Sequence, residues 1–244
     1  MGNKVIGKVG PKLGIYEESN DAQLSASLGQ KREMDDGRVF RLCLNGAGAL
    51  TAGVLVQSIV SFASDDSLEI ATSQSIGDKE VNVTADATSV HAAHTLKDGY
   101  LVMSDTSTDI GTFYKIKDNE ALVSGEDGII YLYDGLTTAI VAGTNGCSIC
   151  VNPYSGVIID ANTAPLVGVP LIAVTAAYYF WALEEGVGPG TDGGSGVAAG
   201  DYLIHTAGNL NLFTVVSGAE APIAIAVTAG AANDALIVKY FGIG

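Results

Sequence analysis

The residues of this sequence best suited to metal or thiol chemistry are two histidines and two cysteines. His91 and His94 form an HxxH pair that could supply two ligands to zinc, and Cys147 and Cys150 have the CxxC spacing of zinc and redox sites. In a strand or coil, residues i and i+3 do not point at one site, and neither pair has a further ligand cluster beside it. We therefore expect no metal site, and we expect buried or half-buried structural thiols.

Two further patterns resemble ligand-binding loops but lack essential positions. Asp105–Gly111 begins like a calcium loop, yet its glycine falls one place late and its twelfth position is Ile116 instead of Glu. Asn45–Gly48 and Gly193–Gly200 are rich in glycine, but no helix, Lys or Thr follows as in a phosphate loop. We interpret all three as turns and expect no cofactor.

Catalytic constellations are also missing from the sequence. No Gly-x-Ser-x-Gly motif occurs, and three histidines leave few general bases. The acidic pairs Asp35-Asp36, Asp65-Asp66 and Glu184-Glu185 are adjacent in sequence, so in strands their side chains point to opposite faces. We predict that the chain is not an enzyme; a β-sandwich hydrolase is the enzymatic alternative, and it has no usable set of residues.

The elements that must position these residues are predicted to be strands. Helical periodicity is almost absent, while short apolar runs separated by Gly, Asn and Asp turns indicate β-sandwiches or barrels. The predicted fold class is all-β, with β-sandwich or β-barrel-like domains and an extended N-terminal arm. The predicted strands are 38–44, 54–62, 80–83, 100–104, 112–116, 129–133, 139–141, 148–152, 156–160, 167–174, 178–184, 201–205, 212–216, 221–227 and 235–240.

A weak internal echo suggests how the strands are organised. Residues 39–57 and 178–205 both read as an aromatic strand, a turn, a short motif ending in glycine and an apolar strand, and Lys97-Asp98-Gly99 gives a shorter version. Duplication and generic hairpin chemistry both explain the echo. We predict an arm over 1–36, a β domain over 37–151 and a second β domain or repeat over 152–244, which could interleave with the first. The glycine-rich stretch 187–196 is predicted to be a mobile surface loop.

Composition and charge exclude several classes of protein. The 244 residues include 12 Lys+Arg against 27 Asp+Glu, for a net charge of −15, and 48% are hydrophobic. Such an acidic chain repels phosphate backbones, so we predict no nucleic-acid partner. The uncharged window 42–64 is too polar for a membrane span, and 161–183 reads as two buried strands with a turn at 175–177, so we expect no membrane span. The N-terminus lacks the apolar core of a signal peptide. Three cysteines argue against a disulfide framework.

Basic residues are concentrated at the N-terminus. From Asp118 to Val238 the chain contains no Lys or Arg, whereas seven of its twelve basic residues lie in the first 41 positions. The segment is interpreted either as a floppy terminus or as an arm that orders on a partner surface. On the second interpretation, the partner-binding residues are Lys4, Lys8, Lys12, Lys31, Arg32, Arg38 and Arg41.

Several strand and turn signatures resemble those of tailed-bacteriophage capsid decoration (cement) proteins. They are Asp36–Leu42 with Asn45-Gly46-Ala47 and Leu50–Gln57, then Asp98–Val102, Ile110–Ile116 and Gly128–Leu136, then Val167–Leu171, Tyr178–Trp181 and Val197–Asp201. The resemblance runs from Gly37 to the C-terminus, and it carries no catalytic residues.

The resemblance implies a non-enzymatic virion protein on the capsid exterior, made in the host cytoplasm, that stabilises the shell by bridging major capsid proteins. It also implies a homotrimer at local three-fold positions. The alternative is a phage tail or fibre adhesin that binds host-surface glycans through residues 187–196 and the nearby Tyr178, Tyr179 and Trp181. Copy number separates the two hypotheses: hundreds per particle for a decoration protein, a few to dozens for a fibre.

Overall fold

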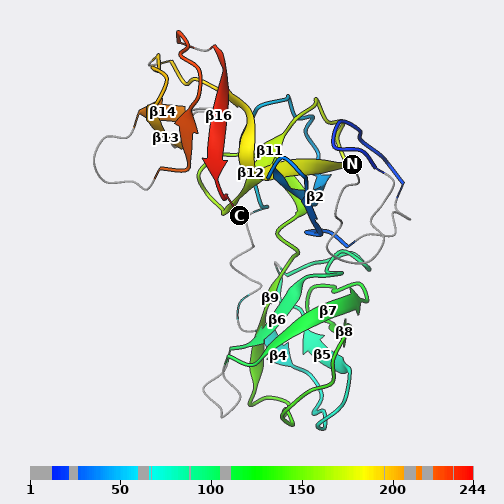
Figure 1. The fold of residues 1–244 in the computed structure, drawn as a ribbon. Coiled ribbons are helices and arrows are strands. Elements are labelled where there is room, and N and C mark those ends of the chain that lie inside the picture. Colours follow the sequence, from blue (N-terminus) through cyan, green and yellow to red (C-terminus); the bar gives the residue numbers. More distant parts are fainter. Residues whose placement is uncertain are drawn as a thin grey trace. The chain divides into compact units, whose positions relative to one another are not determined.

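The structure is a computed structural model that describes residues 13–21, 27–59, 66, 68–87, 89–104, 111–194, 196–205, 213–215, 222–232 and 234–243. All regular elements in these ranges are strands, which confirms the all-β prediction (Figure 1). The chain divides into two units. Unit 1 comprises Met1–Val60 and Pro153–Gly244, and unit 2 comprises Ser61–Asn152.

Five strands of unit 1 form a closed ring. They hydrogen-bond in the order β2–β10–β3–β11–β12, and β12 pairs with β2 to close it. Each ring strand contributes at least one side chain to a common buried cluster, among them Cys43, Val56, Val157, Val167 and Phe180. The ring strands are β2 (Val39–Asn45), β3 (Val56–Gln57), β10 (Ser155–Ile159), β11 (Leu166–Pro170) and β12 (Tyr179–Thr191).

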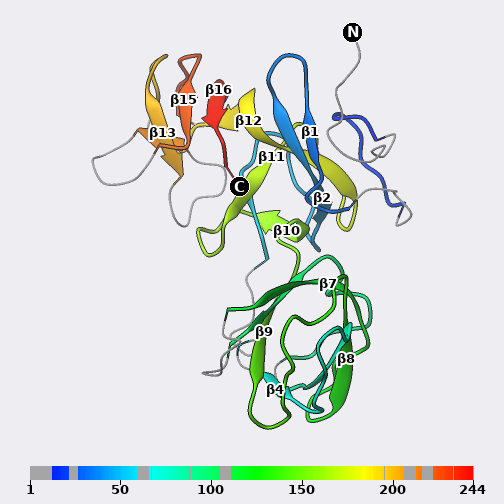
Figure 2. The same ribbon diagram turned by 60° about the horizontal axis from the view of Figure 1, so that its bottom comes forward.

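The long strand β12 extends beyond this ring and carries the rest of the unit 1 sheet. Its second half pairs with β16 (Ala235–Phe241), and β15 (Ala224–Ala226), β13 (Tyr202–His205) and β14 (Phe213–Val215) follow in that order (Figure 2). At the opposite end of the sheet, β1 (Lys31–Glu33) pairs with β2. In the first half of β12, Phe180 packs into the ring while Trp181 and Leu183 pack into a second cluster with Phe40 and Tyr240. Burial on both faces accounts for the nearly continuous apolar sequence there.

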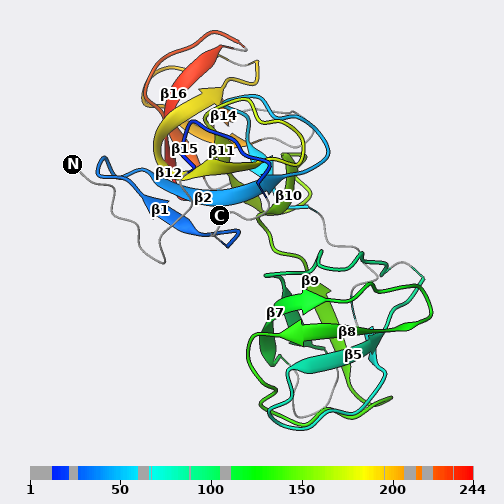
Figure 3. The same ribbon diagram turned by 90° about the vertical axis from the view of Figure 1, so that its right-hand side faces the viewer.

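Unit 2 is a closed six-stranded barrel. Its strands follow the order β4–β5–β8–β7–β6–β9, all neighbours are antiparallel, and β4 pairs with β9 (Figure 3). Alternate residues fill the interior, for example Val81 and Val83 of β5 and Ile130 and Leu132 of β8. The strands are β4 (Leu68–Ile70), β5 (Glu80–Thr84), β6 (Tyr100–Met103), β7 (Phe113–Asn119), β8 (Asp127–Leu132) and β9 (Gly146–Cys150).

A local motif recurs through both units: a single bridge residue, a tight turn and then a strand. The bridge residues pair reciprocally, with two backbone hydrogen bonds in each pair. Three residues after a bridge residue the backbone has a positive φ, between 60° and 95° at the described positions, as a type II turn requires. The pairs are Leu50 with Val174, Val197 with Gly230, Gln74 with Ile140, and His91 with Leu122. The positive-φ residues are Gly53, Gly77, His94, Gly125, Gly143, Ala177 and Gly200.

Carboxylates hold several of these turns. The fourth residue after the bridge is Asp78, Asp201 or Asp234, and each accepts a hydrogen bond of 2.7 to 2.9 Å from the backbone N–H of the first turn residue. The turn at Val174 has Tyr178 at this position. There Glu18 of the N-terminal segment accepts the N–H of Thr175 at 2.5 Å and its hydroxyl at 2.8 Å. A residue distant in sequence thus supplies the missing carboxylate.

The structure divides the chain differently from the boundaries suggested by the sequence. Residues 37–60 belong with 153–244, because β2 and β3 pair with β10, β11 and β12, while 61–152 is an insertion with its own core. The expected mobile loop at 187–196 is wrong for its first half, where Val187–Thr191 belong to β12. A Cβ at Gly188 would overlap the Leu183 side chain, so this glycine serves close packing within a strand.

Candidate functional site

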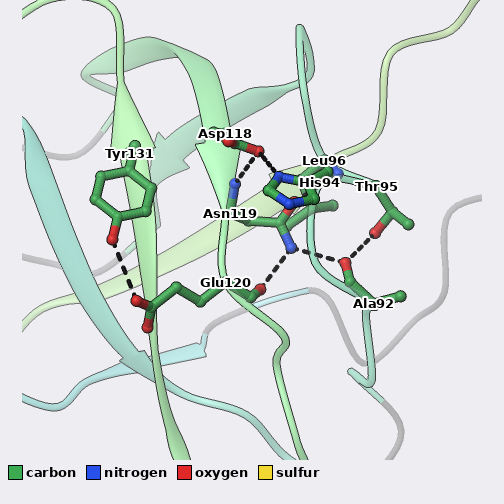
Figure 4. Close-up of polar contacts among 8 residues, drawn as sticks. All are labelled: Ala92, His94, Thr95, Leu96, Asp118, Asn119, Glu120 and Tyr131. Atoms are coloured by element: carbon green, nitrogen blue, oxygen red, sulfur yellow. Dashed lines mark hydrogen bonds and ion pairs between the residues drawn. The ribbon is translucent and has the colours of Figure 1, made fainter. Parts of the chain in front are cut away.

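The two histidines of the HxxH pair have different surroundings. His91 is 8% exposed and forms the bridge to Leu122, whereas the His94 side chain is 75% exposed and its Nδ1 lies 2.8 Å from Asp118 Oδ1 (Figure 4). Desolvation alone would raise the pKa of Asp118, but the hydrogen bonds from His94 and from the backbone N–H of Asn119 lower it on balance. In the described part of the chain, no group of three His, Cys, Asp or Glu could hold a metal ion.

The polar contacts beside His94 have a structural role. Asn119 is 1% exposed, its Nδ2 donates to the carbonyls of Ala92 and Glu120, and its Oδ1 accepts the N–H of Leu96 at 2.8 Å. Figure 4 shows this side chain between β7 and the 92–96 segment, while the Tyr131 hydroxyl reaches the Glu120 carboxylate separately. The Asn119 side chain therefore supplies hydrogen-bond partners to backbone groups that no neighbouring strand pairs with, and it holds the 92–96 segment that precedes β6.

The CxxC pair lies within β9, and its two thiols have different surroundings. Cys147 is buried in the barrel core and Cys150 is exposed, and neither is part of a disulfide. Burial raises the pKa of Cys147 to about 12, and burial also raises that of Cys43. These two thiols are protonated and inert at neutral pH.

The described basic residues at the start of the chain are engaged within unit 1. The Arg32 side chain donates to the Leu13 carbonyl and lies over the Trp181 ring. Arg38 pairs with Asp36 at 2.7 Å, and Arg41 makes two hydrogen bonds to the Glu184 carboxylate. Lys31 is half-buried on β1, opposite Arg41. Lys4, Lys8 and Lys12 of the predicted partner-binding set lie outside the described residues, as does 105–110 of the calcium-like loop.

The N-terminal segment is extended but packs on its own unit. Leu13 and Ile15 belong to the same core cluster as Trp181, whose Nε1 donates to the Leu13 carbonyl at 3.0 Å. Trp181 is only 2% exposed. The expectation that Trp181 joins Tyr178 and Tyr179 in a glycan-binding surface is therefore wrong for Trp181. This packing could not be predicted from the sequence, because isolated apolar residues such as Leu13 and Ile15 have no periodicity.

Unit 1 presents an exposed apolar face on β12, β16, β15 and β13. Its large side chains are Val187, Tyr202, Val227, Ile237 and Phe241, which are 45 to 54% exposed. Their register places them on one side of the sheet: Val187 lies opposite Lys239, Tyr202 opposite Ile225 and Ile225 opposite Lys239. The Tyr202 and Phe241 rings are in contact, with centroids 6.2 Å apart. We call these five side chains the apolar face; strand 235–241 signals it by being apolar on both of its faces.

Unit 2 carries a polar hollow of about 530 Å³ on its outer wall. It lies where the turn after Gln74 meets β5 and β8, and both polar and charged side chains line it. Two of its residues, Gln74 and Asn82, each have a covered side-chain oxygen without a hydrogen-bond partner in the described structure. Among its lining residues are Thr72, Gln74, Asp78, Glu80, Asn82 and Ile129.

Comparisons with known proteins give no family for this chain. No family model matches it, and neither a curated protein nor a solved structure matches it. Within the described ranges, no helix has the length and apolar character needed to cross a membrane.

Proposed function

We propose that this chain is a non-enzymatic structural protein of a bacteriophage virion that decorates the outside of the capsid and stabilises it by bridging major capsid proteins. The apolar face of unit 1 is the observation that carries the proposal. A chain with a net charge of −15 has little reason to leave five large apolar side chains on one sheet face unless a partner covers them.

The construction of this face suits a preformed contact surface. The buried side of the same strands packs Leu236, Val238 and Tyr240 into the unit 1 core, so the exposed side chains stand on a rigid sheet. Lys239 lies among them and the exposed Glu185 lies opposite Phe241, so a few charged groups accompany the apolar side chains. Rigid apolar area with a few polar groups is typical of the centre of stable protein interfaces.

The proposed docking surface differs from the one inferred from the sequence. Arg32, Arg38 and Arg41 already have intramolecular partners, so they have less to offer a second protein. The apolar face has no such engagement in the described structure. The homotrimer and the virion location are part of the proposal through the resemblance to decoration proteins.

The first test is the copy number and position of the protein in purified particles, by quantitative mass spectrometry and cryo-electron microscopy. We expect hundreds of copies on the head exterior. A few copies at the tail would favour the adhesin alternative, and absence from particles would refute both virion functions.

The second test adds purified protein back to capsids that lack it. The wild-type protein should bind and raise the capsid melting temperature, while Ile237→Ser should weaken binding by about 10- to 100-fold because it removes buried apolar area. Val141→Ser is the matched control, since Val141 is 51% exposed and belongs to unit 2, so it is not one of the five side chains of the apolar face. Equal binding of the two variants would contradict docking through this face.

A further inference from the structure

We propose that the polar hollow of unit 2 is a binding site for a neutral saccharide unit, in addition to any role of unit 1 in docking. The site is built by Gln74 and Asn82, with Glu80 and Thr72 at its rim. This inference does not depend on the proposed capsid function, because it concerns a different unit and a different class of ligand.

The recurring turn motif shows how unusual Gln74 is. Five of the eight bridge residues of the motif are buried hydrophobes, each at most 7% exposed, and the other three are Gln74, His91 and Gly230; the five are Leu50, Leu122, Ile140, Val174 and Val197. Gln74 occupies the equivalent position and pairs with Ile140 through two backbone hydrogen bonds of 3.0 Å. Its backbone satisfies the motif, but its side chain departs from it. A polar residue that breaks a structural pattern without a structural gain is a candidate functional residue.

Two side chains that line the hollow also have unsatisfied hydrogen-bonding groups. Gln74 Oε1 and Asn82 Oδ1 are covered, and neither has a partner in the described structure; the Gln74 amide makes only a long contact of 3.4 Å to the Thr72 hydroxyl. A covered polar group without a partner is costly, and native proteins retain few of them. A small rotation of either amide toward the hollow would bring its unpaired oxygen within reach of a ligand, and the hydrogen bond so formed would offset the cost of leaving the group unsatisfied in the free protein.

The chemistry of the lining selects hydroxyl groups. A hydroxyl both donates and accepts, so it can satisfy Gln74 and Asn82 whichever way each amide is turned. Asp78 and Glu80 against Lys79 leave the lining with a net negative charge, which disfavours phosphates and other anions. The Lys79 ammonium donates to the Tyr133 carbonyl at 2.9 Å and so is already engaged.

The shape of the hollow fits one or two sugar rings. Its volume of about 530 Å³ is within the range of small-molecule sites. Ile129 lies opposite Asn82 and Tyr131 lies opposite Glu80 across the β5–β8 pair, so apolar surface adjoins the polar groups. Sugars present both kinds of surface, with C–H faces and hydroxyl edges.

The loop that forms the rim is held in place before any ligand binds. The Gly77 N–H donates to the Leu136 carbonyl and the Leu136 N–H donates to the Asp78 carbonyl, both at 2.8 Å. Ser75 N–H is bound by the Asp78 carboxylate at 2.7 Å. A preformed site loses less conformational entropy on binding, which matters for weakly binding ligands such as sugars.

The test is a titration of the ¹⁵N-labelled full chain with glucose, galactose, rhamnose and N-acetylglucosamine, followed by NMR. We expect at least one sugar to give saturable shifts confined to the amides of 72–82 and 129–131. Shifts elsewhere only, or none with any of these sugars at 50 mM, would overturn the proposal. Saturable shifts of the same amides with Ca²⁺ and none with sugars would assign a cation site instead.

Gln74→Leu is the decisive variant because it restores the hydrophobic residue found at five equivalent positions. It should fold with unchanged or higher stability and weaken sugar binding about tenfold. Thr51→Ala, at an exposed position in the equivalent turn of unit 1, should leave both properties unchanged. Unchanged sugar affinity in a folded Gln74→Leu variant would refute the assignment. Asn82→Ala provides a second, independent variant if Gln74→Leu proves unstable.

Discussion

At the scale of single residues, the recurring turn explains where glycine is used and where it is replaced. The third position after a bridge requires a positive φ, which costs an L-amino acid roughly 1–2 kcal/mol. Gly53, Gly77, Gly125, Gly143 and Gly200 avoid that cost. His94 and Ala177 adopt φ values of 67° and 60° and bear it. The turn type thus accounts for five of the 31 glycines of the chain.

Two substitutions in unit 1 should therefore change stability in opposite directions. Gly200→Ala should lower the free energy of unfolding by about 1 kcal/mol, because a Cβ meets no atom within 4 Å and only the backbone is strained. Ala177→Gly should raise it by roughly 0.5 kcal/mol, since relief of strain exceeds the added entropy of the unfolded chain. Urea unfolding measures both changes in free energy, provided that its dependence on urea concentration is the same for the variants and the wild type. Shifts of the same sign would show that the turns do not share this backbone requirement.

At the scale of elements, most strands could be predicted and their partners could not. The strands at 100–103, 129–132 and 235–240 follow from short apolar runs between turn residues. The outer half of β12 was missed because Gly186, Gly188 and Pro189 are typical of loops. Here Gly188 makes room for Leu183, and Tyr240 donates its hydroxyl to the Pro189 carbonyl. Such reasons lie in long-range packing, which a local pattern does not contain.

The candidate surfaces illustrate the same limit. The basic residues were visible in the sequence, but Glu184 lies 143 positions from Arg41, so their ion pair could not be foreseen. The hollow depends on a bridge between Gln74 and Ile140, which only the fold establishes. By contrast, the opposite facing of Cys147 and Cys150 follows from strand geometry alone.

The N-terminal segment should contribute strongly to the stability of unit 1. Removing residues 1–26 deletes the burial of Leu13 and Ile15 and the Glu18 carboxylate that holds the Val174 turn. Two buried aliphatic side chains are worth about 3–6 kcal/mol together. We expect a large fall in the melting temperature of unit 1, measured by calorimetry.

Removing residues 1–12 is the matched control, because that truncation keeps all of these contacts. Equal stability of the two truncated proteins would mean that the packing of 13–21 adds little. Removing residues 1–35 would also delete β1. That variant is unsuited to testing partner binding, because a loss of binding could result from the loss of structure.

At the scale of the whole molecule, the chain is one β unit with a second inserted into it. The two strands of unit 1 that flank the insertion pair with each other, because Gln57 lies opposite Ile158 and Val56 opposite Ile159 in an antiparallel register. All six strands of the unit 2 barrel come from the continuous segment 61–152. Each unit has its own buried core. This is the arrangement in which domain insertion leaves both folds intact.

The two units should therefore fold separately. Residues 61–152 expressed alone should give a cooperative unfolding transition, since a closed barrel leaves no unpaired strand edge. Unit 1 with 61–152 replaced by a short Gly-Ser linker should keep its fold, because the chain ends to be joined lie beside the β3–β10 pair. Circular dichroism and NMR of both products check this, and the amide spectra should overlay those of the full chain away from the junctions. If either product were unfolded while the full chain is stable, the insertion would be part of one cooperative structure, and the apolar face and the polar hollow could not be assigned to independent units.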